Sequence, residues 1–348
     1  MKKLNFIFIS LIIIIFFLSI ILIIKLHSKK GDLDFIQVHL PVMGTVLEIK
    51  LYGKDTEKLN DAINSAVDEI RRIEGRFSIF MDSEVAKINS SAYGKPFRCS
   101  DEMWTIIKEC QSYHEISEGA FDITIRPMML LWGFYKKRNK LPSENEINET
   151  LKKIGFKQII LDDNNKTIQF RSKDMSLDFG GIVKGYAVDR AIAKIAEKGV
   201  SSGFVNLGGN IKTLKNPPPG KESYTMGIRD PLDKMNICGI VEFTGSKSLA
   251  TSGNYERYLI LENKHITHII NPLDGRPVEN MLSVTVLAPD AIAADALSTS
   301  VFIKGAKLAE KINKENPEIE FLIFRRNESG KIILEKFGNS WQIDQVPQ

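Results

Sequence analysis

One short segment combines an acid, three glycines and a lysine: Asp178-Phe179-Gly180-Gly181-Ile182-Val183-Lys184-Gly185. It lies where a strand is expected to end and a helix to begin. Glycine lets the backbone approach a ligand closely or adopt positive φ, and the first N–H groups of a helix are free to bind an anion. Taken alone, the segment also fits a purely structural turn, because it has the spacing of neither a P-loop nor a Rossmann fingerprint.

Length and charge limit the possible functions. The chain has 348 residues, enough to bury a sizeable core in one large domain or two smaller ones. Its net charge of +4 comes from five lysines within residues 1–30, and the remainder carries 42 basic and 43 acidic residues. A nearly neutral folded part without a basic stripe disfavours nucleic-acid binding.

The N-terminal residues predict a signal or membrane-anchoring segment. Residues 4–24 are apolar apart from Asn5, Ser10 and Ser19, and as a helix they would extend roughly 30 Å, about one hydrocarbon core. An uncleaved anchor is favoured over a cleaved signal peptide, because lysines rather than an Ala-x-Ala-like site follow. Lysines on both flanks leave the orientation open. The predicted organisation is a signal-anchor or signal peptide at 1–30, a polar stem at 31–40 and one domain at 41–345.

The three cysteines, Cys99, Cys110 and Cys238, do not form a disulfide framework, because their number is odd and small. They also contain no Cys-x-x-Cys pair for metal or redox chemistry. We expect three structural thiols, with a single disulfide in an oxidising compartment as the alternative.

Hydrophobic periodicity predicts a mixture of helices and strands. Helices are expected over residues 55–74, 83–90, 100–116, 143–155, 186–198, 291–303 and 306–313. Strands are expected at 45–52, 158–161, 167–170, 203–207, 224–228, 237–243, 258–261, 282–287, 321–324 and 332–334. Long helices, antiparallel-looking strands and the lack of a clear linker after residue 40 favour one interlocked α+β domain.

A carboxylate and a hydroxyl stand one turn apart in the predicted helix 291–303. Asp295 and Thr299 share one face of that helix, and such oxygens suit a hard cation such as Mg²⁺ when a carbonyl and ligand oxygens join them. Alone, a solvated acid and a core threonine are the commoner explanation. The same holds for His268, which by itself is more often a structural strand residue than a base.

Seven segments occur together and in order, and their combination is specific. They are Met43-Gly44-Thr45, Phe121-Asp122, Asp178 to Asp189, Asn206-Leu207-Gly208-Gly209-Asn210, Thr251-Ser252-Gly253-Asn254-Tyr255, His268 to Pro277, and Ala294-Asp295-Ala296-Leu297-Ser298-Thr299. Together they resemble the ApbE family of flavin transferases, the FAD:protein FMN transferases. The resemblance extends from residue 43 to about residue 303, some three quarters of the chain.

The resemblance implies an exported, membrane-associated enzyme that binds FAD and Mg²⁺. Such an enzyme splits the FAD diphosphate, places FMN on a Thr or Ser hydroxyl of a partner protein through a phosphoester bond, and releases AMP. The family's metal ligands correspond to Asp295, Thr299 and the backbone carbonyl of Val183, where the family usually has alanine. The implied cofactor-binding residues are Met43, Phe121, Asp122, Asp178, Lys184, Asn206, Leu207, Gly208, Gly209 and His268.

The implied chemistry gives roles to three side chains. Phosphoryl-type transfer depends mainly on positioning and charge neutralisation, so Lys184 and the metal held by Asp295 would stabilise charge on the diphosphate. His268 is the best candidate by residue type for removing the proton of the acceptor hydroxyl, although it could instead orient a phosphate.

One position departs from the family pattern. Ser78-Ile79-Phe80 resembles a Ser-Thr-Tyr segment that places an aromatic hydroxyl near the flavin, and Phe80 lacks this hydroxyl. The balance between transfer to an acceptor and hydrolysis by water is therefore open, because both nucleophiles compete for one phosphorus.

Three functions remain distinguishable. The first is FMN transfer to an extracytoplasmic flavoprotein, for example a subunit of an Rnf- or Nqr-like complex, by a catalytic domain outside the cell membrane. The second is an FAD pyrophosphatase that yields FMN and AMP. The third is a membrane-tethered FAD-binding protein without catalysis, which the Asp295–Thr299 pair argues against because FAD binding alone needs no metal.

Overall fold

The computed structural model describes residues 26–30, 33–233 and 235–347. The apolar segment predicted at 4–24 lies outside these residues. None of the helices in the described ranges is long and apolar enough to cross a membrane.

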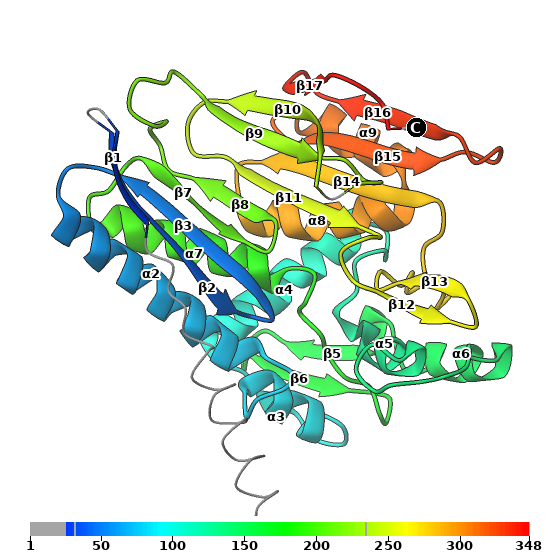
Figure 1. Ribbon diagram of the computed structural model, residues 1–348. Coiled ribbons are helices and arrows are strands. Elements are labelled where there is room, and N and C mark those ends of the chain that lie inside the picture. The colour runs from blue at the N-terminus through cyan, green and yellow to red at the C-terminus, as the bar shows by residue number, and fades with distance from the viewer. Residues whose placement is uncertain (1–25, 31–32, 234, 348) are drawn as a thin grey trace, which may run out of the picture.

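A large antiparallel sheet organises the protein (Figure 1). In the described part of the chain it has nine strands, in the order β1-β2-β3-β7-β8-β11-β14-β15-β16. Neighbouring strands all pair antiparallel, as the sequence predicted for most of them. Their bounds are β1 Leu26–Lys30, β2 Leu33–Val42, β3 Thr45–Tyr52, β7 Gly203–Leu207, β8 Asn210–Thr213, β11 Ser248–Gly253, β14 Met281–Ala288, β15 Glu320–Arg326 and β16 Ile332–Phe337.

Four helices lie along one face of this sheet (Figure 1). They are α2 Thr56–Phe77, α7 Val183–Glu197, α8 Ala291–Lys304 and α9 Ala306–Glu315. The side chains of β15 show that both faces of the large sheet are covered at its C-terminal end. Phe321 and Ile323 point into the core beneath the helices, whereas Leu322 and Phe324 alternate toward a second core.

A smaller sheet covers the opposite face at the C-terminal end (Figure 1). Its order is β17-β10-β9, with β9 Tyr224–Arg229, β10 Ile237–Phe243 and β17 Trp341–Ile343. Tyr224, Val241 and Trp341 pack there against Leu287 and Leu322 of the large sheet. The helix layer, the large sheet and this small sheet confirm the expected α+β class.

The remaining elements form a lower layer beside the sheet ends (Figure 1). The helices are α3 Glu84–Ser91, α4 Asp101–Ile116, α5 Arg126–Trp132 and α6 Glu144–Leu151, with two short 3₁₀ turns at Ile123–Ile125 and Phe156–Gln158. The strands are β4 Phe97–Arg98, β5 Ile159–Asp162, β6 Thr167–Phe170, β12 Tyr258–Leu261 and β13 Lys264–Thr267. The capping box predicted at Ser143 and Glu146 is present at the start of α6.

The polar stem predicted over residues 31–40 is wrong for residues 33–40, which belong to β2. Ile36 and Val38 are buried and alternate with the polar Gln37 and His39, so this part of the chain has the period of a half-buried strand. Residues 26–30, assigned from the sequence to the signal segment, form β1 and pair with β2. The polar residues within 33–40 suggest a linker when the sequence is considered alone. Pairing with β3 makes these residues a strand.

Helix α7 begins at Val183, three residues before the predicted start, so Val183, Lys184 and Gly185 form its first turn. The glycine at position 185 concealed this start, because glycine is a poor helix former. The three cysteines are free and buried, which confirms the expectation of structural thiols.

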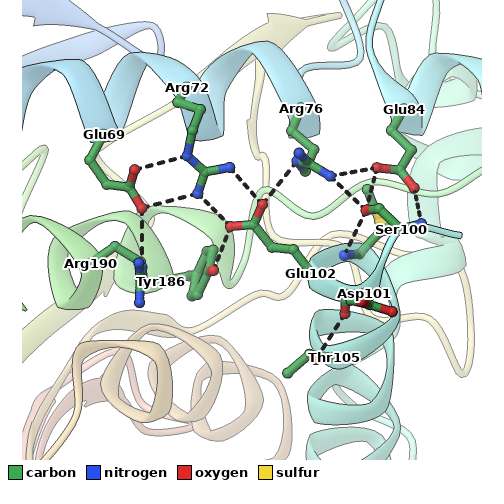
Figure 2. Close-up of polar contacts among 11 residues, drawn as sticks. Glu69, Arg72, Arg76, Glu84, Ser100, Asp101, Glu102, Thr105, Tyr186 and Arg190 are labelled. Atoms are coloured by element: carbon green, nitrogen blue, oxygen red, sulfur yellow. Dashed lines mark hydrogen bonds and ion pairs between the residues drawn. The ribbon is translucent and has the colours of Figure 1, made fainter.

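A chain of charged side chains ties the helices of the two layers together (Figure 2). Arg72 on α2 donates to Glu69 at 2.8 and 3.0 Å and to Glu102 on α4 at 2.6 and 2.7 Å. Glu102 also accepts from the Tyr186 hydroxyl of α7 at 2.6 Å. Arg76 continues the chain from Glu102 to Glu84 of α3, and Arg190 of α7 binds Glu69. These bonds hold α7 against α2 and α4, next to the site described below.

Candidate active site

A cleft of about 500 Å³ opens where β3, the β7–β8 turn and β11 meet the starts of α5 and α7 and the middle of α8. The sequence-predicted residues that line it are Met43, Phe121, Asp122, Asp178, Val183, Lys184, Gly208, His268, Asp295 and Thr299. A second hollow, of about 710 Å³, lies beside Arg325 and Arg326 and contains none of the predicted site residues.

Two tight hairpin turns form one wall of the cleft. Residues 43–44 join β2 to β3 with φ of 52° and 70°, and residues 208–209 join β7 to β8 with φ of 59° and 90°. Positive φ at both central positions is the signature of the type I′ hairpin turn. A Cβ on Gly208 would lie 2.5 Å from the Thr45 hydroxyl oxygen, so only glycine permits the two turns to lie this close together.

The first turn of α7 presents the lysine to the cleft. Its Nζ donates to the carbonyl of Gly180 at 2.9 Å and forms an ion pair with Asp295 Oδ1 at 3.4 Å. Asp178 accepts from the backbone N–H of Gly180 at 2.8 Å through Oδ1 and from the Tyr135 hydroxyl through Oδ2. The glycine-rich segment leads into α7 as expected, but it follows a loop rather than a strand. Asp178 stabilises its bend, and Lys184 lies in the first turn of the helix.

Asp295 and Thr299 of α8 lie opposite this turn. Asp295 Oδ2 accepts from the backbone N–H of Gly185 at 3.0 Å, which leaves Oδ1 directed toward Lys184. The Thr299 hydroxyl lies 3.4 Å from that of Ser252 on β11. Gly181 packs beside it, because a Cβ there would lie 3.6 Å from the Thr299 hydroxyl. Asp295 and Thr299, which share one face of α8, thus contact the residues at the start of α7. The sequence alone could not establish this contact.

The donor atoms at this point are hard oxygens. Asp295, Thr299 and Val183 all line the cleft, and together they can offer a carboxylate, a hydroxyl and a backbone carbonyl. Within the described ranges no group of three or more His, Cys, Asp or Glu side chains could hold a metal by itself. One carboxylate with neutral oxygens fits a hard cation that keeps water or phosphate ligands, and does not fit the Cys- and His-rich set of a structural zinc site.

His268 reaches the cleft from the segment after β13. Its Nδ1 lies 2.9 Å from the backbone carbonyl of Arg257. Because a carbonyl can only accept, Nδ1 carries the proton and Nε2 keeps its lone pair. Burial, together with the nearby positive charges of Lys184 and Arg257, lowers the pKa of His268 to about 4. The imidazole is therefore neutral at pH 7, which a proton acceptor requires.

Asp122 borders the cleft, but its carboxylate is committed to the fold. Oδ1 accepts from the backbone N–H of Thr124 at 2.8 Å and from its hydroxyl at 2.6 Å, and Oδ2 accepts from the N–H of Phe156 at 2.9 Å. Burial raises the pKa of this carboxyl. We therefore assign Asp122 to positioning the loop that carries Phe121 rather than to direct contact with a cofactor.

Three residues predicted to contact a cofactor do not line the cleft. Leu207 is completely buried in the main core. Asn206 accepts from the backbone N–H of Gly209 at 3.0 Å and donates to Glu48 at 3.3 Å, so it supports the turn from outside. Gly209 is the third. The segment belongs to the site through Gly208 and Asn210, which both line the cleft. Leu207 points from β7 into the core, and Asn206, on the other face of the strand, is bonded to Gly209 and Glu48.

Several cleft residues were missed by sequence reasoning. Tyr135 lines the cleft, binds Asp178, and packs edge-on against Phe80 with ring centroids 5.6 Å apart. Glu74 of α2 accepts from the backbone N–H of Met43 at 2.8 Å. Asn210 lines the cleft with an amide oxygen that is buried and unpaired. Asn210 ends the segment 206–210, although it was not predicted as a site residue. No sequence pattern identifies Tyr135 or Glu74, since packing brings each of them to the cleft.

Phe80, the position that departs from the family pattern, lies at the cleft and is 76% exposed. Its ring packs edge-on against Tyr135 and is otherwise largely exposed. An apolar ring in this position can stack on a planar ligand but can donate no hydrogen bond.

The sequence pattern that defines the ApbE family matches residues 43–323. The chain belongs to the ApbE family. The match includes every residue of the cleft described above.

Relatives and solved structures agree with this family. The chain is 29% identical over 304 residues to the FAD:protein FMN transferase of Vibrio cholerae, covering 84% of this chain and 89% of that protein. It is 28% identical to the enzyme of the same name from Escherichia coli, covering 83% and 84%. The crystal structure of the ApbE protein of Thermotoga maritima superimposes with a TM-score of 0.78 at 31% identity, covering 86% of this chain and 96% of that one.

Proposed function

We propose that this protein transfers FMN from FAD to a Thr or Ser hydroxyl of an acceptor protein in a Mg²⁺-dependent reaction that releases AMP. The observation that carries the proposal is the meeting, in one cleft, of Lys184, Asp295, Thr299 and a neutral His268. The names of the curated relatives, FAD:protein FMN transferases, support the same activity.

The bonds made and broken are those of one phosphoryl-type transfer. The acceptor hydroxyl oxygen bonds to the phosphorus that carries the ribityl chain, and the bond from that phosphorus to the bridging oxygen breaks. AMP leaves with the bridging oxygen and its electron pair, and FMN remains on the acceptor as a phosphoester. The acceptor's proton passes to a base.

The residues of α7 and α8 would hold the diphosphate. The Lys184 ammonium lies 3.4 Å from Asp295 Oδ1, and both residues border the cleft. The ammonium can therefore pair with a phosphate oxygen, and the Asp295 carboxylate can then bind a cation. Asp295, Thr299 and the carbonyl of Val183 would bind Mg²⁺. When bound, Mg²⁺ neutralises charge that develops on the phosphate oxygens.

His268 is suited to accept the proton of the acceptor hydroxyl. Nδ1–H donates to the Arg257 carbonyl, so the ring orientation is fixed and Nε2 is available as the acceptor. The bound diphosphate adds negative charge near the ring, which favours the imidazolium and thus strengthens the base at the moment of transfer.

The opposite part of the cleft would hold the flavin. Met43 and Phe121 provide apolar surface, Phe80 provides a ring face for stacking, and Gly208 lets the ligand approach the backbone. Asn210 offers an unpaired amide oxygen that can accept from a donor group of the ligand.

The test is to incubate the full-length protein with FAD, Mg²⁺ and a candidate acceptor flavoprotein, and to weigh the acceptor. A mass gain equal to FMN, with release of AMP, supports the proposal. AMP without an adduct indicates an FAD pyrophosphatase, and FAD binding without AMP indicates a non-catalytic binding protein. The acceptor Thr→Ala variant is the matched control and must remain unmodified.

We further propose that residues 4–24 anchor the protein in the cell membrane, with the catalytic domain on the extracytoplasmic side. The apolar length of this segment and the lysines that follow it support the proposal. An acceptor such as a subunit of an Rnf- or Nqr-like complex would then share that side. Protease added to intact cells or spheroplasts should digest the catalytic domain, and protection of that domain would reject this orientation.

A further inference from the structure

Helices α7 and α8 each lack a cap of their own. Neither Ile182, the residue before α7, nor Asp290, the residue before α8, makes a side-chain capping bond. The first N–H groups of a helix otherwise need a partner, especially where the helix start is packed against other elements.

The missing caps are supplied reciprocally. Asp295 of α8 accepts from the N–H of Gly185 in the first turn of α7 at 3.0 Å. Asp189 of α7 accepts from the N–H groups of Ala291 and Ile292 in the first turn of α8, at 3.0 and 2.9 Å. Each aspartate stands four residues after the position that the other one caps, so the two helices run antiparallel and lock each other's starts.

Two further contacts fix this arrangement. A Cβ on Gly185 would lie 2.2 Å from the carbonyl oxygen of Ala291, so the backbones of the helices are as close as glycine permits. Lys212 of β8 donates to Asp189 Oδ1 at 2.6 Å and pairs with Asp290 at 3.2 Å. The Lys212 side chain is largely buried, so its charge requires Asp189 as a partner.

We propose that Asp189 is a positioning residue for the reaction. It sets α8 against α7 so that Asp295 Oδ1 and Thr299 face the first turn of α7 and the cleft. Asp189 does not line the cleft itself, and its effect passes through α8. This inference rests on the proposed function, because it concerns the metal and diphosphate end of the same site.

Asp189→Asn is the variant that tests the role. An amide has one acceptor oxygen, so it can serve only one of the two α8 N–H groups, and its NH₂ group faces donors that include Lys212. The variant should shift Asp295 and Thr299 relative to Lys184. We expect the Mg²⁺ concentration for half-maximal AMP release to rise about tenfold, the size typical when the support of a metal ligand is lost.

Asp290→Asn is the matched control. It removes the same charge one residue before α8 and also contacts Lys212, but Asp290 is 65% exposed and caps no N–H. It should leave the Mg²⁺ dependence within about twofold of the wild type, since exposed ion pairs contribute little.

The decisive readouts are binding measurements on the full-length protein. Binding of Mn²⁺ in the presence of FAD, followed by electron paramagnetic resonance, should weaken in Asp189→Asn and not in Asp290→Asn, whereas FAD affinity in EDTA should stay within about twofold of the wild type in both. Equal Mn²⁺ affinities in the two variants, or an equal loss of FAD and Mn²⁺ binding in Asp189→Asn, would overturn the positioning role. Absence of AMP release from the wild type would reject the proposed function instead, and the Mn²⁺ comparison would still decide the role of Asp189.

Discussion

At the scale of the residue, the site depends on what each side chain is already bonded to. Asp122 and Asp178 both lie beside the cleft and have both oxygens bonded. Asp122 binds Thr124 of its own loop and the N–H of Phe156. Asp178 binds the N–H of Gly180 and the Tyr135 hydroxyl, which itself lines the cleft. His268, in contrast, has one nitrogen bonded and one free. Residue type alone does not show which side chains are free to act on a ligand. Their hydrogen-bond partners in the folded protein do.

His268 should remain unprotonated far below the usual range of histidine. Its lowered pKa, about 4, means that the neutral and active form persists as pH falls through 6.5, and that protonation removes it only near pH 4. We expect the acid limb of kcat/KM for FAD, which reports the free enzyme, to lie below pH 5.5. The His268 ring signals in an NMR titration check the assignment directly. Lys184→Met should raise this pKa, because it removes a neighbouring positive charge, and an unchanged titration would contradict the account.

Asn210→Leu should have opposite effects on stability and on binding. The amide oxygen is buried without a partner, so replacing the side chain by an apolar one of similar size should raise the free energy of unfolding by about 1 kcal/mol in the absence of ligand. FAD affinity should fall about tenfold if the ligand satisfies this amide. Denaturant unfolding and quenching of FAD fluorescence measure the two quantities. Unchanged FAD affinity would show that Asn210 does not bind the ligand.

At the scale of the element, the site is a contact between the start of α7 and the middle of α8. The glycine-rich segment ends in Gly185, whose absence of a side chain allows the Ala291 carbonyl to approach. The close approach brings Asp295 within 3.0 Å of the α7 backbone. A motif on one helix therefore becomes functional only through its partner helix.

Gly185→Ala should separate these helices. The new Cβ would lie 2.2 Å from a backbone oxygen, which cannot move as a side chain can, so we expect a loss of about 1–3 kcal/mol in stability together with loss of AMP release. Gly75→Ala on α2 is the control, because its Cβ would meet nothing within 4 Å. Alanine is the better helix former, so this control should match or exceed wild-type stability. Equal melting temperatures for the two variants would contradict the packing argument.

At the scale of the whole molecule, the charged chain of Figure 2 joins the helices on which the site stands. Glu69 is its most buried acid, and hydrogen bonds from Arg72 lower its pKa from 4.5 to about 2. Because the native state holds this carboxylate ionised, the stabilisation is present above pH 4.5 and is lost as pH falls toward 2.

Glu69→Gln should therefore flatten the acid dependence of stability. The wild type should lose up to about 3 kcal/mol from this group between pH 4.5 and 2, whereas the variant should start lower at pH 7 and change less over that interval. Urea unfolding at several pH values measures the difference. Glu197→Gln, which removes an exposed acid from α7, is the control and should follow the wild-type pH dependence. Parallel curves for Glu69→Gln and the wild type would show that the network contributes little.

Periodicity and capping patterns were sufficient for most helices, because local signals define them. Ser100 caps the start of α4 and Ser143 caps the start of α6, as predicted. The errors lie where partners decide the structure. The sequence predicts a stem where β2 lies, because the residues of β2 do not reveal that it pairs with β3. It also places the start of α7 three residues too late, because the residue that caps this start, Asp295, lies on a distant helix.

The sequence by itself determined the family, the α+β class and the set of residue types that the proposed chemistry needs, since these depend on motifs and on local periodicity. Only the tertiary structure decided which members of that set share the cleft. It placed Lys184, His268, Asp295 and Thr299 together, and left Asn206 and Leu207 behind the wall. It also brought in Tyr135 and Glu74, which belong to no motif. The physical reason is that a side chain's direction and its free bonding capacity are set by contacts between elements far apart in the chain.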